Sequence, residues 1–232
     1  MTFVARVCVV SGPELAPGLW TWSAPHPEWS AERSGVGGWE QDVGSWLLEE
    51  GGHVVLIDPL LPEDPGVLEW LDERARGRSV DVLITVNWHL RSAKAISDRY
   101  RATVWGNAKT REDVEELVTG IVEDGAALPG GVLPFTPIPS DSDEPEAAYW
   151  LPRQRALAVG DILINTPEGL RIWWEQKTDE LRTEFHDSLL PTLRRLLSLP
   201  IELILVPHGG PVTLDARRAL EQALEAPTWQ RS

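Results

Sequence analysis

Three polar residues that could carry out chemistry each come shortly after a short apolar segment. The pairs are residues 80–85 followed by His89, residues 155–159 followed by Asp161, and residues 202–206 followed by His208. In layered α/β proteins the loops at the carboxyl ends of strands converge on one crevice, so these side chains are expected to meet. Imidazole nitrogens and a carboxylate oxygen suit a borderline divalent metal such as zinc. The alternative for either histidine taken alone is a structural residue held by hydrogen bonds.

The segment around His89 also carries a permanent positive charge. It reads Asn87-Trp-His-Leu-Arg-Ser92 and stands between an apolar strand and a helix. The guanidinium of Arg91 would repel a nearby dication, and it could instead form a bidentate pair with Asp161. The protein itself would then supply the cation, and Arg91 and Asn87 would bind a small anionic ligand without a metal. The alternative for Arg91 is a solvated residue near the start of a helix.

Short apolar segments alternate with helical patterns along the chain, which is typical of an α/β or α+β layered domain. The predicted strands cover residues 3–10, 19–22, 43–48, 53–57, 80–85, 102–105, 132–135, 147–151, 155–159 and 202–206. No stretch has the composition of an interdomain linker. One domain is therefore expected over residues 1–232.

The helices are expected from their capping residues and from apolar positions at helical spacing. They are one that begins at Pro65 after the cap Asp64 and is closed by Gly77, one capped by Ser92, and one over residues 214–224. A further helix contains Pro191, and it is predicted to restart near Asp187 or Ser188 because proline is tolerated in the first turn.

The composition narrows the class of partner. A net charge of −15 and a pI near 4.7 disfavour binding to nucleic acid or to anionic lipid, because like charges repel. Solubility alone is the alternative explanation of this charge. The single cysteine, Cys8, excludes an intramolecular disulfide and a cysteine-built zinc site. The sequence contains no secretory signal and no apolar run of about eighteen residues, so a soluble, cytoplasmic protein is expected.

Tryptophan is unusually frequent, with twelve residues against two tyrosines and three phenylalanines. These rings either form an aromatic wall over a ligand pocket or fill the core while their N–H groups reach hydrogen-bond partners.

Five short motifs follow one another between residues 43 and 211. They are Val43-Gly-Ser-Trp-Leu-Leu, Val54-Val-Leu-Ile-Asp-Pro, Val82-Leu-Ile-Thr with a histidine after it, Ala156-Leu-Ala-Val-Gly-Asp and Leu205-Val-Pro-His-Gly-Gly-Pro. In this order they resemble the metallo-β-lactamase superfamily, over roughly residues 40–212. The resemblance implies a four-layer αββα sandwich, with two sheets face to face between helices and metals held at the sheet edges.

The sequence departs from the second motif of that family, which is usually Thr-His-x-His-x-Asp-His. If one extra residue follows Thr85, His89 takes the second histidine position. Asn87, Arg91 and Ser92 then replace the first histidine, the aspartate and the last histidine. Without the extra residue no ligand of this motif remains.

The resemblance leaves three metal ligands. Asp161 matches the bridging aspartate of the family and His208 its late histidine, while residues 135–143, where another histidine is usual, contain none. His89, Asp161 and His208 are too few for a dinuclear centre, but three protein ligands and a water suffice for one metal. Asp58 resembles a family aspartate that supports the site from outside the ligand set.

Two functions are expected from these residues. The first is a hydrolase-like protein with a reduced, at most mononuclear, metal site built from His89, Asp161 and His208. In this hypothesis His89 and Asp161 are catalytic residues, the cofactor is one zinc or another divalent ion, and water attacks an ester, thioester or lactone carbonyl. The second is a non-catalytic member of the fold that has no metal and binds a small anionic ligand through Arg91. The partner is a small molecule in both, and metal content separates them.

Overall fold

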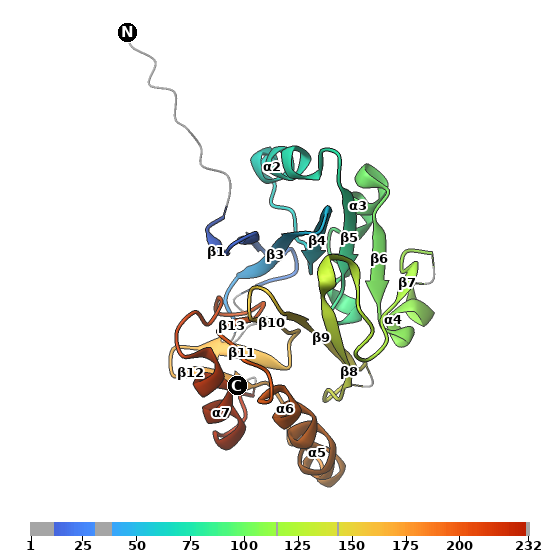
Figure 1. Cartoon of the computed structure of the whole chain (residues 1–232). Helices are drawn as coiled ribbons and strands as arrows, with labels where there is room; N and C mark the ends of the chain where they lie inside the picture. The colour runs from blue at the N-terminus through green and yellow to red at the C-terminus, as the bar shows by residue number, and fades with distance from the viewer. Residues whose placement is uncertain (1–11, 31–38, 115, 143, 231–232) are drawn as a thin grey trace.

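Two β-sheets lie face to face, and helices cover the outer side of each sheet (Figure 1). The computed structural model describes residues 12–30, 39–114, 116–142 and 144–230. The strand predicted over residues 3–10, which includes Cys8, lies outside these ranges.

The strands form a large sheet, a smaller sheet and a hairpin. The large sheet runs in chain order through β1 (Glu14–Ala16), β2 (Leu19–Pro25), β3 (Asp42–Glu50), β4 (His53–Ile57), β5 (Ser79–Leu83), β6 (Thr103–Gly106) and β7 (Gly120–Ile121). The smaller sheet has the order β13 (Leu203–Leu205), β10 (Ala156–Ala158), β9 (Glu146–Leu151) and β8 (Leu133–Ile138). The hairpin pairs β11 (Leu163–Thr166) with β12 (Gly169–Ile172).

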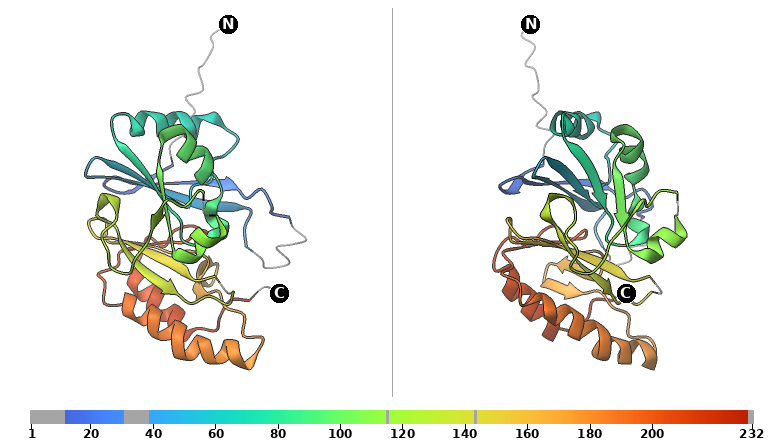
Figure 2. Two further views of the ribbon diagram at one scale, coloured as in Figure 1. Left: turned by 90° about the vertical axis from the view of Figure 1, so that its right-hand side faces the viewer. Right: turned by 45° about the vertical axis from the view of Figure 1, so that its right-hand side comes forward.

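The helices divide into a group from the first half of the chain and a group from the second. The first group is α2 (Pro65–Ala75), the 3₁₀ turn η1 (Asn87–Leu90), α3 (Ala93–Tyr100), α4 (Ala108–Asp113) and the 3₁₀ turn η2 (Pro129–Gly131). The second is α5 (Asp179–Glu184), a π turn (Phe185–Leu189), α6 (Leu190–Leu196) and α7 (Ala216–Glu225). The left view of Figure 2 shows the teal helix α2 above the two sheets and the orange and red helices below them. The predicted αββα order of layers is confirmed.

Strands of both sheets bury side chains on both of their faces. On β4, Val55 and Ile57 belong to the core between the two sheets, whereas Val54 and Leu56 pack in the core beneath α2 and α3. On β10 of the other sheet, Leu157 faces the core under α6 and α7. Because successive side chains point to opposite faces, a strand covered on both sides is apolar at consecutive positions. This is why these strands read as unbroken apolar runs.

Two of the predicted helix starts differ from the structure in detail. Ser92 stands at the start of α3, but its backbone is not extended as an N-cap requires. Its hydroxyl instead accepts a hydrogen bond from the Leu61 backbone N–H at 2.9 Å. The helix does not restart near Asp187 or Ser188, because the π turn joins α5 to α6 without a break, and Pro191 lies in the first turn of α6.

The β11–β12 hairpin was not predicted, and it has a direct bearing on the cleft. It directly precedes Trp173, whose backbone N–H donates to the Ile162 carbonyl at 3.0 Å. Trp173 thereby comes to line the cleft that follows β10 and β13. Within the described ranges, no helix combines the length and the apolar composition needed to cross a bilayer.

Candidate functional site

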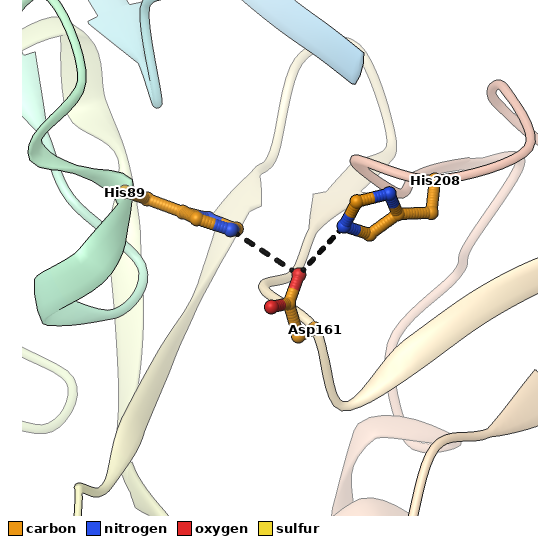
Figure 3. A group of neighbouring side chains, drawn as sticks. All are labelled: His89, Asp161 and His208. Carbon is orange, nitrogen blue, oxygen red and sulfur yellow. Dashed lines mark ion pairs between the residues drawn. The ribbon is translucent and has the colours of Figure 1, made fainter. Parts of the chain in front are cut away.

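The structure brings His89, Asp161 and His208 together at one end of the two sheets. His89 lies on η1 after β5 of the large sheet, and the other two follow β10 and β13, which are parallel neighbours in the smaller sheet. The Nε2 atoms of both histidines lie 3.2 Å from Asp161 Oδ1, and Figure 3 shows the two rings pointing toward that oxygen from opposite sides. The convergence of the three strand ends is as expected.

Hydrogen bonds fix the ring of His89. Its Nδ1 lies 2.9 Å from Asp58 Oδ2 and 3.1 Å from Thr85 Oγ1. Asp58 is fully buried, and its Oδ1 accepts the Thr85 backbone N–H at 2.9 Å. A carboxylate can only accept, so Nδ1 carries the proton and Nε2 of a neutral ring presents its lone pair to the site. Asp58 thus has the supporting position expected of it.

Aromatic rings, in contrast, hold the ring of His208. The Trp39 and Trp173 rings meet it edge to face, with centroids 4.8 Å and 5.7 Å away. His208 Nδ1 is buried and has no hydrogen-bond partner within the described part of the chain. No regular spacing in the sequence links these tryptophans to the site.

The two oxygens of Asp161 have different surroundings. Oδ2 accepts a hydrogen bond from the indole N–H of Trp88 at 2.8 Å. Oδ1 is buried, and its contacts with the two imidazoles do not have hydrogen-bond geometry, so it has no such partner among the described residues.

The donor atoms fit one divalent metal ion. His89 Nε2, Asp161 Oδ1 and His208 Nε2 all lie within 4.8 Å of one another. Two ligands of a tetrahedral ion with bonds of about 2.0–2.2 Å are about 3.3–3.6 Å apart, slightly more than the two separations of 3.2 Å. Two imidazoles and one carboxylate form a ligand set that zinc and similar ions accept.

Charge is distributed unevenly over the site when no ion is present. Burial and Arg91 lower the pKa of His89, but the carboxylates of Asp161 and Asp58 outweigh them and raise it to about 9. Burial raises the pKa of Asp161, but the two imidazoles outweigh this and hold it well below its usual value. Burial lowers the pKa of His208.

Arg91 lines the cleft, but the expected bidentate pair with Asp161 is wrong. Its Nη1 donates to the carbonyl of Gly44 on β3 at 3.2 Å and to that of Asp58, directly after β4, at 3.1 Å. Its Nε and Nη2 are buried and have no hydrogen-bond partner in the described ranges. Arg91 has a φ of 38°, a strained conformation for a residue with a Cβ, and the side chain is half-buried rather than solvated.

Asn87, the other predicted ligand-binding residue, is half-buried on η1. It is not among the described side chains that line the cleft. Its role in binding stays a prediction.

A cleft of about 920 Å³ opens over the site. Its walls are His26, Pro27, Glu28, Trp39, Leu60, Trp88, His89, Arg91, Ser92, Asp161, Trp173 and His208. Three indoles, those of Trp39, Trp88 and Trp173, therefore share the walls of the cleft with the three candidate ligands. For these three tryptophans the alternative of an aromatic wall applies, while Trp46 and Trp174 are fully buried in the core.

A smaller cavity of about 290 Å³ shares Trp88, Asp161 and Trp173 with the cleft. It is lined by Trp88, Ser140, Asp141, Ser142, Glu146, Asp161, Ile162, Trp173 and Glu175. Burial and the charge of Asp161 raise the pKa of Glu146 to about 8. A Cβ on Gly160 would lie 2.4 Å from Glu146 Oε2, so the turn before Asp161 requires glycine.

Comparison with known proteins adds information about the fold. No protein-family model and no curated protein matches the sequence significantly. Solved structures do match. A metallo-β-lactamase family protein from Thermus thermophilus is 21% identical with a TM-score of 0.59, over 91% of this chain and 79% of that one.

Two further structures agree. The DIM-1 metallo-β-lactamase, in a crystal exposed to ceftazidime, is 11% identical with a TM-score of 0.63, over 92% of this chain and 95% of that one. A β-lactamase domain protein from Burkholderia ambifaria is 19% identical with a TM-score of 0.62, over 93% of this chain and 75% of that one. These similarities match the four layers and their connections described above. The chain has the metallo-β-lactamase fold.

Proposed function

We propose that this chain is a hydrolase that works with one divalent metal ion held by His89, Asp161 and His208. The observation that carries the proposal is the buried Asp161 Oδ1, which has no hydrogen-bond partner among the described residues and lies 3.2 Å from two imidazole nitrogens. A divalent ion in such a site polarises a carbonyl and makes hydroxide available near neutral pH.

Each of the three ligands has a separate task in this proposal. Asp161 offsets part of the charge of the ion. His89 is held by Asp58 so that Nε2 faces the ion, which fixes both the tautomer and the direction of the ring. His208 completes the set from the smaller sheet. Arg91 adds a positive charge to the wall of the cleft, where it favours the negative charge that develops on a carbonyl oxygen under attack.

The proposed substrate is a small ester, thioester or lactone. The cleft of about 920 Å³ is within the size range of small-molecule sites. The indoles of Trp39, Trp88 and Trp173 offer apolar surface to the part of the substrate that does not react.

Metal analysis of protein purified without chelators tests the proposal. We expect about one equivalent of a divalent metal in the wild type and a large loss of occupancy in His208→Ala. His186→Ala, which removes an exposed histidine of the π turn, is the matched control and should keep the metal. Hydrolysis of a panel of aryl esters, thioesters and lactones should disappear on chelation and return with the metal. A wild type without metal, or a His208→Ala variant with full occupancy, would contradict the assignment.

The second candidate is a metal-free protein that binds a small anion through Arg91. It is favoured by the position of Arg91 on the wall of the cleft, where its guanidinium donates only to backbone carbonyls and has no carboxylate partner among the described residues. A buried guanidinium lacking a direct carboxylate partner is costly unless an anion joins it. Calorimetric titration of chelator-treated protein with small carboxylates tests this candidate, and Arg91→Lys should weaken binding. Equal affinity in both proteins would rule out Arg91 as the anchor.

A further inference from the structure

We infer that Trp88 is a positioning residue that restricts Asp161 to a single oxygen ligand. The inference rests on the proposed function, because it concerns how Asp161 meets the metal ion. The indole N–H of Trp88 donates to Asp161 Oδ2 at 2.8 Å, and Oδ1 is the oxygen that lies 3.2 Å from both imidazoles.

The indole suits this task for a chemical reason. Its N–H is a donor and has no lone pair, so Trp88 can hold a carboxylate oxygen but cannot itself bind a metal ion. A hydrogen bond to a charged acceptor is also stronger than one between neutral groups. Trp88 therefore fixes the rotation of the Asp161 carboxylate without competing for the ion.

The position of Trp88 shows how it keeps Asp161 Oδ2 away from the metal ion. Trp88 and Asp161 both line the cleft and also the acidic cavity that contains Asp141 and Glu146. The indole thus stands beside Asp161 where the two spaces meet. Without its N–H, Oδ2 would be free to turn toward the metal as a second oxygen ligand. The coordination number would then rise from four, three protein ligands and a water, to five.

The test uses cobalt(II) as the probe ion in the full-length protein. Trp88→Phe removes the N–H and keeps an aromatic ring. We expect its visible d–d absorption to weaken and change shape, as a four-coordinate ion becomes five-coordinate. Its cobalt dissociation constant should rise about 10- to 100-fold, the usual effect of losing a group that supports a ligand. Trp70→Phe is the matched control. Trp70 packs against the core beneath α2 and α3, and its indole N–H has no hydrogen-bond partner among the described residues. The spectrum of Trp70→Phe should equal that of the wild type.

A second measurement needs no metal. The indole N–H signal of Trp88 in ¹⁵N-labelled, chelator-treated protein is identified by its loss in Trp88→Phe. It should lie downfield of a free indole N–H, because it donates to a carboxylate. A signal at the position of a free indole N–H would overturn the inference. An unchanged cobalt spectrum and affinity in Trp88→Phe would overturn it as well. A wild type that binds no cobalt would overturn the proposed function, and with it any role of Trp88 toward a metal.

Discussion

His89 and His208 face the same carboxylate oxygen, yet the protein holds the two rings in different ways. Around His89 lies a polar network in which Asp58 and Thr85 bind Nδ1. Around His208 lie the edges of two indoles, and no hydrogen bond to Nδ1 is present in the described residues. A hydrogen bond that the ring donates to a carboxylate selects the tautomer and the charge of the ring, whereas aromatic edges restrict only its orientation.

The difference has an electrostatic consequence. The carboxylates that surround His89 raise its pKa to about 9, against the effects of burial and of Arg91, whereas burial lowers the pKa of His208. In the absence of metal, one imidazole of the site is charged at neutral pH and the other is neutral. The two histidines of the site therefore differ in charge when no metal is bound.

Removing the polar network should produce the largest effect. Asp58→Ala leaves His89 and Thr85 buried without their acceptor, and the free energy of unfolding should fall by about 3–5 kcal/mol. Urea unfolding of chelator-treated protein measures this. Asp72→Ala, which breaks an exposed pair with Arg99, should cost far less, because solvent screens a surface ion pair. Equal losses in the two variants would show that the network contributes no more than a surface contact.

The pH dependence of stability should sharpen the contrast. The folded state raises the pKa of His89 from about 6.5 to about 9, so the stability from its protonated form is complete below pH 6.5 and is lost as pH rises through 9. The loss should approach about 3 kcal/mol in metal-free protein. His208 has the opposite sign: its lowered pKa favours the neutral ring, so its contribution is lost as pH falls below 6.5. Urea unfolding between pH 5 and 9.5 tests this, and His89→Gln should remove only the alkaline loss.

Removing an aromatic ring that contacts His208 should have the smallest effect on the free energy of unfolding. Trp39→Leu removes one of the two rings that contact His208, and unfolding should become easier by about 1 kcal/mol. The alkaline loss of stability should stay as in the wild type, because the Asp58–His89 network is intact. A variant that lost this pH dependence would show that the two sides of the site are not independent.

The sequence predicted the layers and the three strand ends well, and for a local reason. Unbroken apolar runs and turn residues locate strands such as β4, which covers the predicted residues 53–57, and the alternation with helices gives the class of fold. The order of the motifs supplied the rest of the architecture. The topology then brings His89, Asp161 and His208 together. His89 follows β5 of the large sheet, and the other two follow the parallel neighbours β10 and β13 of the smaller sheet. The prediction of one domain over residues 1–232 stays a prediction.

Side-chain directions were the part that could not be predicted. The contact between Trp39 and His208 joins residues that are far apart in the chain, and no spacing rule relates them. The direction of Arg91 depends on a positive φ that a non-glycine residue rarely adopts. The hydrogen bond from Trp88 to Asp161 likewise arises only when the two sheets meet. Such features belong to tertiary structure and carry no local signal.

The origin of the ligands has a consequence for the mechanics of the molecule. His89 comes from the large sheet, and Asp161 and His208 come from the smaller one. An ion bound by all three would act as a cross-link between the two halves of the sandwich. By mass action, a free ion at 100 times its dissociation constant would then stabilise the folded chain by about 2.7 kcal/mol. Separation of the two sheets during unfolding would require release of the ion. The concentration of free metal would therefore set how strongly the two sheets are held together, as well as the occupancy of the site.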